Sequence, residues 1–91
     1  MSNRDRKTWS IGAEYDDDIR AWLRDALEAR GYSITDKTWA VAGSQELAAW
    51  EFDGPIGPVT VRAETYTGLA ISADTRLVEE LEMEFHGRVQ Q

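Results

Sequence analysis

Hydrophobic and polar residues alternate at the beginning of the chain. Between Lys7 and Ala13, Thr8 and Ser10 alternate with Trp9 and Ile11. Because successive side chains of a strand point to opposite faces, this alternation places Trp9 and Ile11 on one face. The pattern therefore predicts a strand over residues 7–13.

The next segment changes from period two to helical spacing. Its apolar positions are Ile19, Trp22, Leu23, Ala26 and Leu27, and they predict an amphipathic helix over residues 17–30. Gly31 suits the left-handed position after a helix, and Tyr32 can then pack back on Leu27. We interpret Asp16-Asp17-Asp18 as the N-terminal cap of this helix and not as a cation site.

Period two returns between Thr35 and Ala73, where it predicts a meander of four antiparallel strands. The breaker segments 43–46, 54–57 and 66–68 fit its three turns. If each segment forms the whole turn, one face carries the apolar pairs Val41–Ala48, Trp39–Trp50, Phe52–Val59, Trp50–Val61, Ala63–Ile71 and Thr65–Leu69. We expect Trp39 and Trp50 to be buried and adjacent.

The last element is a second helix, with Asp74 as its N-cap and Gly87 as its stop after His86. Its apolar stripe consists of Leu77, Val78, Leu81 and Phe85. The order strand, helix, four strands, helix predicts an α+β two-layer sandwich with both helices on one face of the sheet. We expect residues 1–91 to form a single domain and residues 1–6 a flexible N-terminal arm. The pattern does not place the first strand within the sheet.

Composition narrows the possible functions. The 91 residues include no cysteine, and 17 acidic against 10 basic residues give a formal charge of −7. This charge argues against nucleic acid as a partner, since such binding depends on cations. The absence of cysteine favours the cytoplasm, no apolar run is long enough for a membrane, and no cofactor motif is present. We therefore expect no cofactor, no nucleic-acid partner and no membrane association.

The final helix carries the only constellation that could hold a metal. Glu79, Glu82 and His86 fall on one face at helical spacing. We favour a solvated helix face here, and predict no catalytic, cofactor or metal site. An alternative is a small enzyme or ligand-binding domain, with a pocket between helices and sheet that uses His86, Glu82 or Tyr66.

The same helix is also a candidate partner-binding surface. Glu79, Glu80, Glu82 and Glu84 lie in the middle and C-terminal half of the helix, where the macrodipole favours cations, and Met83 lies among them. We call the residues Glu79, Glu82, Met83 and Glu84 the acidic ridge, and predict that it contacts the basic surface of an unknown protein partner. The sequence thus favours a small acidic, non-enzymatic regulator, inhibitor or antidote-like module.

The outward face of the meander offers a second surface. It carries small side chains and few charges, and such a face could be solvated or could pair two copies into a homodimer. Its residues are Thr38, Ala40, Ala42, Leu47, Ala49, Glu51, Thr60, Arg62, Glu64, Ala70 and Ser72.

Overall fold

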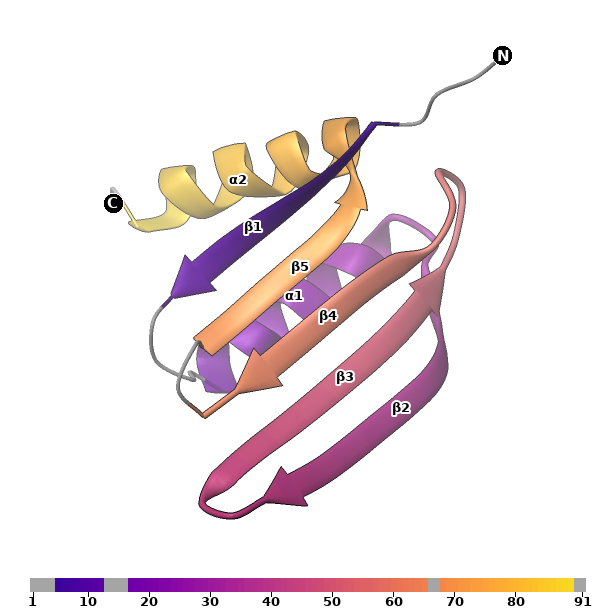
Figure 1. The fold of residues 1–91 in the computed structure, drawn as a ribbon. Coiled ribbons are helices and arrows are strands. Elements are labelled where there is room, and N and C mark those ends of the chain that lie inside the picture. The colour runs from indigo at the N-terminus through magenta and orange to yellow at the C-terminus, as the bar shows by residue number, and fades with distance from the viewer. Residues whose placement is uncertain (1–4, 13–16, 66–67, 90–91) are drawn as a thin grey trace.

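The computed structural model describes residues 5–12, 17–65 and 68–89, which form an antiparallel sheet and two helices (Figure 1). The elements are β1 Arg6–Gly12, α1 Asp17–Ala29, β2 Ser33–Ala42, β3 Gln45–Asp53, β4 Val59–Glu64, β5 Gly68–Asp74 and α2 Thr75–Val89. The strand order is β1-β5-β4-β3-β2. The predicted α+β fold and its meander are confirmed, and β1 takes the place beside β5.

One row of side chains crosses all five strands on the face that the helices cover. Paired positions place Lys37, Trp50, Val61, Ile71 and Trp9 next to one another in that order. Val61 and Ile71, in the middle of the row, are buried, whereas Trp50 is half-buried. The row therefore passes from the core of the domain to its surface at β2.

Both helices pack on this face but cover only part of it. Leu23 and Leu27 of α1 and Leu77 and Leu81 of α2 are almost completely buried in one cluster with the central strands. Phe85 of α2 completes the cover, with its ring 5.5 Å from the rings of both Trp9 and Trp22. The two helices thus lie over β1, β5 and β4, and β2 extends beyond the part of the sheet that they cover (Figure 1).

The register of the β2–β3 hairpin differs from the sequence-based expectation. Ala42 pairs with Gln45, so Trp39 lies opposite Ala48, and the predicted pairs Trp39–Trp50 and Val41–Ala48 are wrong by two residues. The turn is a two-residue loop that begins at Gly43, whose φ of 64° suits the first position of a type II′ turn. Because the error is even, every side chain keeps its predicted face.

The β4–β5 hairpin shows the same two-residue error. Ala63 lies opposite Leu69 and Val61 opposite Ile71, so the predicted pairs Ala63–Ile71 and Thr65–Leu69 are wrong. The predicted pairs Phe52–Val59 and Trp50–Val61 of β3 and β4 are confirmed.

The predicted end of α1 is confirmed in detail. The Tyr32 amide donates to the Leu27 carbonyl at 3.0 Å and the Gly31 amide to the Glu28 carbonyl at 3.1 Å, which is the Schellman pattern. Gly31 has a φ of 89°, in the left-handed region that favours glycine. Tyr32 is thereby turned into the core, where its hydroxyl accepts a hydrogen bond of 3.2 Å from the Ile56 amide.

The start of α2 agrees with the prediction and its end does not. The Asp74 carboxylate accepts a hydrogen bond of 2.9 Å from the Arg76 amide, as an N-cap does. The helix passes through Gly87 and ends at Val89. Gly87 does not have a positive φ, and a glycine that keeps helical angles weakens a helix without ending it.

The N-terminal boundary of the fold lies one residue earlier than expected. Arg6, which the sequence analysis assigned to the arm, belongs to β1, and its guanidinium donates to the carbonyls of Pro58 and Ser72 at 3.1 and 3.0 Å. Neither helix of the described chain has the length and apolar character that crossing a membrane requires.

Candidate binding site

The helices leave the β2 side of the sheet open. Three large apolar residues of β2 stay exposed on the helix-facing side, by 51% for Ile34, 65% for Trp39 and 53% for Val41. Trp39 was expected in the core, but no helix reaches it. It lies opposite Ala48, two positions along β3 from Trp50. The buried core therefore ends at Trp50, and the apolar side chains of β2 on the same face remain exposed to solvent.

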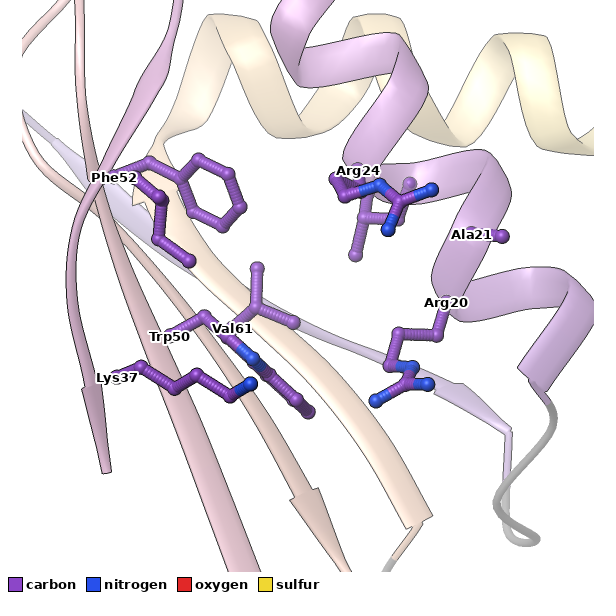
Figure 2. A pocket seen from close by; sticks show the side chains of 9 residues that line it. Arg20, Ala21, Arg24, Lys37, Trp50, Phe52 and Val61 are labelled. Carbon is purple, nitrogen blue, oxygen red and sulfur yellow. The ribbon is translucent and has the colours of Figure 1, made fainter. Parts of the chain in front are cut away.

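A cleft lies where α1 meets this open half. It has a volume of about 270 Å³, and side chains from both layers line it (Figure 2). Leu23, Phe52 and Val61 are buried and form its apolar base, while Trp50 is half-buried at its side. The remaining lining residues are Arg20, Ala21, Arg24, Ile34 and Lys37.

Three of the residues that line this cleft are cations. Figure 2 shows Arg20 extending from α1 toward the sheet and Lys37 extending from β2 toward the helix. The guanidinium carbon of Arg20 lies 5.3 Å from the centre of the Trp50 ring, within cation–π range. Arg24 follows Arg20 by one helical turn. Among the residues that the structure describes, no carboxylate lines the cleft, so its described lining is positive in an acidic protein.

The cleft continues along the β2–β3 hairpin. A second hollow of about 600 Å³ shares Arg20, Lys37 and Trp50 with the first. It adds Thr38, Trp39, Glu46, Ala48, Ala63, Glu64 and Thr65. The two hollows together form a groove, which we call the β2 groove. It runs from Phe52 to Glu46, a span of roughly 20 Å at about 3.3 Å per residue.

The acidic ridge is placed on α2, at the other side of the domain from β2. Glu79 and Met83 are exposed, and Met83 is 75% exposed. Glu82 accepts a hydrogen bond of 2.7 Å from the ammonium of Lys7 on β1. This bond and the nearby negative charge raise the pKa of Lys7 above its ordinary value.

The other glutamates of the ridge region contact the end of α1. The Arg30 guanidinium donates to the carboxylate of Glu84, to that of Glu80 at 3.4 Å, and to the Ala26 carbonyl at 3.0 Å. The hydrogen bond to Glu84 is the main cause that raises the pKa of Arg30, followed by that to Glu80. Glu82 and Glu84, which the sequence analysis placed in the unfavourable half of the helix, thus have a structural explanation, because they bind Lys7 of β1 and Arg30, the residue that follows α1.

The other predicted candidates do not meet in a site. His86 is exposed, with its ring 6.3 Å from that of Phe85, and neither His86 nor Glu82 lines the cleft. Tyr66 lies outside the described residues. Within the described ranges, no group of three or more His, Cys, Asp or Glu side chains is close enough together to hold a metal ion.

The sequence analysis did not identify the residues of the cleft. A signal was present in α1, which has the cation Arg20 near its N-terminus while its last turn has no basic residue. The helix dipole favours the opposite arrangement. No signal in the sequence indicated that Lys37 lies across from α1.

Comparison of the chain with known protein families, curated proteins and solved structures found no match. The assignment of function therefore depends on the geometry described above.

Proposed function

We propose that this domain is a non-enzymatic protein-binding module that receives its partner on the open β2 side of the sheet. The observation that carries the proposal is the exposure of Ile34, Trp39 and Val41 in a row on one strand. Large apolar side chains gathered on the surface of a small domain mark interaction sites, because covering them removes apolar area from water. Tryptophan is also enriched at the centres of protein interfaces.

The free edge of β2 supports the same proposal. β2 is the last strand of the sheet, so one side of its backbone has no strand partner among the described residues. Proteins commonly protect such edges with proline, short strands or bulges. β2 has ten residues and no proline, and its one bulge lies near its start, between Ile34 and Asp36. A partner strand could extend the sheet along the remaining residues.

The acidic ridge remains a second proposed surface, for a partner with basic groups. Met83 is the most exposed large apolar residue in the part of the chain that the structure describes, and Glu79 on the same helix is exposed. These two residues support the proposal best, since Glu82 and Glu84 have cationic partners within the domain. We also propose the outer face of the sheet as a contact between two copies of the domain. Because cysteine is absent, we propose the reducing cytoplasm as the location of the protein.

Two paired variants separate the surfaces. Trp39→Ser/Val41→Ser removes the apolar row of β2, and Glu79→Lys/Met83→Lys alters the ridge; all four residues are solvent-exposed, so we expect both variants to fold. Each would be compared with the parent domain for proteins that co-purify from its own cells, with circular dichroism as the folding control. We expect the β2 variant to lose a partner that the ridge variant retains.

The opposite pattern would assign the partner to the ridge and contradict the β2 assignment. A partner that both folded variants retain would exclude the two surfaces together. Sedimentation equilibrium of the parent domain tests the homodimer, because a second copy bound through the outer face must double the mass at high concentration.

A further inference from the structure

We propose that the cleft between α1 and the β2–β3 hairpin binds a small apolar carboxylate, of the class of medium-chain fatty acids. This site goes beyond the protein-binding surface proposed above, since it lies under α1 and can be occupied without a partner protein. Three observations lead to it: the apolar base of the cleft, the cations around that base, and the lack of a carboxylate among the described residues that line it.

The base of the cleft suits an apolar body. Leu23, Phe52 and Val61 are only 1%, 4% and 3% exposed, so their side chains form a fixed surface. Trp50 and Ile34 add partly exposed walls. The volume of about 270 Å³ equals roughly nine waters at about 30 Å³ each. It is close to the lower limit of small-molecule sites, about 300 Å³.

The cations define the charge of the ligand. Within the described ranges, Arg24 forms an ion pair only with its neighbour Asp25, at 3.7 Å, and both side chains are more than half exposed. Such exposed pairs are weak, so the guanidinium can exchange this contact for a ligand. No carboxylate of the described residues lies within ion-pair distance of Lys37, and its ammonium points into the cleft from the opposite wall (Figure 2).

The distribution of charge makes this arrangement unusual. The described lining of the cleft includes three basic residues and no acidic one, in a chain of formal charge −7. Arg20 and Arg24 repel each other one turn apart, and Arg20 lies near the N-terminus of α1, where the helix dipole disfavours cations. An anion placed between them and Lys37 relieves these repulsions. Because the other six lining residues are apolar, a single charge on an apolar body fits the cleft better than a polyanion.

The test uses decanoate and its uncharged analogue 1-decanol as probes of the intact domain. Heteronuclear NMR of the ¹⁵N-labelled protein would follow both titrations. We expect decanoate to bind saturably, with the largest shifts in the amides of residues 20–24 and 34–37, and 1-decanol to bind at least about tenfold more weakly, the usual order for loss of one charge-assisted hydrogen bond. Equal affinity for the two probes, or no saturable shift with decanoate, would overturn the proposal.

Charge reversal locates the carboxylate. Lys37→Glu and Arg24→Glu should each weaken decanoate binding by about tenfold or more. The matched control is Arg62→Glu, an exposed cation of β4 on the opposite face of the sheet, which should leave the affinity within about twofold because it is screened from the cleft. Lys37 is exposed, so its variant should keep the fold. Folded Lys37→Glu and Arg24→Glu proteins that bind decanoate as well as the parent would contradict the assignment.

Discussion

The ammonium of Lys7 lies 2.7 Å from the Glu82 carboxylate, so the first strand of the sheet is bonded to the last helix. The two residues are 75 positions apart in the chain. Their side chains are 38% and 24% exposed, and the contact therefore lies at the boundary between α2 and solvent. It gives Glu82, at the middle of α2, a cationic partner from another element of the fold.

A double-mutant cycle should detect this contact. Lys7→Met and Glu82→Gln should each lower the melting temperature, because each leaves the other residue without its partner. The double variant should lose less than the sum of the two single losses. Thermal unfolding by circular dichroism measures all four proteins. Strictly additive losses would show that the pair contributes nothing in solution.

The contribution of this pair should also depend on pH at the alkaline end. The pKa of Lys7 is raised in the folded state by its bond to Glu82, relative to the ordinary lysine value of about 10.4. The stabilisation is therefore fully present below the unfolded-state pKa and is lost as pH rises through the folded-state pKa. We expect the stability difference between parent and Lys7→Met to be constant from neutral pH to about pH 9. It should then decrease above about pH 10.5, and denaturant titrations at fixed pH values measure this change. A difference unchanged at still higher pH would contradict the assignment.

Arg30→Ala should destabilise the junction of the two helices. Its guanidinium contacts two glutamates of α2 and the Ala26 carbonyl, and its side chain is only 24% exposed. We expect a loss of about 1–2 kcal/mol in the free energy of unfolding. Arg76→Ala is the matched control, because Arg76 is 80% exposed, and it should change stability by no more than about 0.5 kcal/mol. Equal losses in the two variants, measured by urea titration, would argue against the junction.

Two glycine-to-alanine substitutions should have opposite signs. A Cβ at Gly54 would lie 2.4 to 2.8 Å from ring atoms of Tyr32, whose ring is held in the core, so Gly54→Ala should cost about 1–3 kcal/mol. At Gly87 a Cβ meets nothing within 4 Å, and Gly87→Ala should stabilise α2 by about 0.5–1 kcal/mol. Urea titration of both variants measures the difference. A neutral Gly54→Ala would mean that Tyr32 can move aside.

The two tryptophans of the β2–β3 hairpin should differ in their effect on stability. Trp39 is 65% exposed, so Trp39→Ala should stay within about 0.5 kcal/mol of the parent. Trp50 is half-buried against the core, and Trp50→Ala should cost roughly 1.5–3 kcal/mol, about half the usual loss for a buried tryptophan. Thermal unfolding decides the order. A larger loss at Trp39 would place it in the core after all.

The sequence correctly predicted the face of the sheet on which the strand side chains lie, but it predicted neither the register of two hairpins nor how far the helices extend across the sheet. The side-chain period of a strand is two, so the pattern assigned Trp39 and Trp50 to the correct face even though the turn at Gly43 was read two residues too long. Burial depends on what lies above a residue, and the pattern does not show how far a helix extends across a sheet. The exposure of Trp39 and the cleft beside Lys37 therefore needed the structure.

The acidic ridge illustrates the same limit for charge. From the sequence alone, Glu82→Lys/Glu84→Lys should relieve an unfavourable dipole interaction and stabilise the domain slightly. With Lys7 and Arg30 beside these positions, the double change brings like charges together and should destabilise it. The ion pairs that the fold forms with Lys7 and Arg30 therefore outweigh the effect of the helix dipole on these two glutamates.

The pairing of β1 with β5 has a consequence for the order in which the chain folds. The hairpins β2–β3, β3–β4 and β4–β5 need only short loops, whereas β1 must find a strand about sixty residues away. Local contacts form sooner than distant ones, so we expect the meander to form first and β1 to close the sheet in a late step. Kinetic φ-values would then be low at Trp9 and higher at Val61. Such a chain passes through a state in which β5, and not only β2, is an open edge.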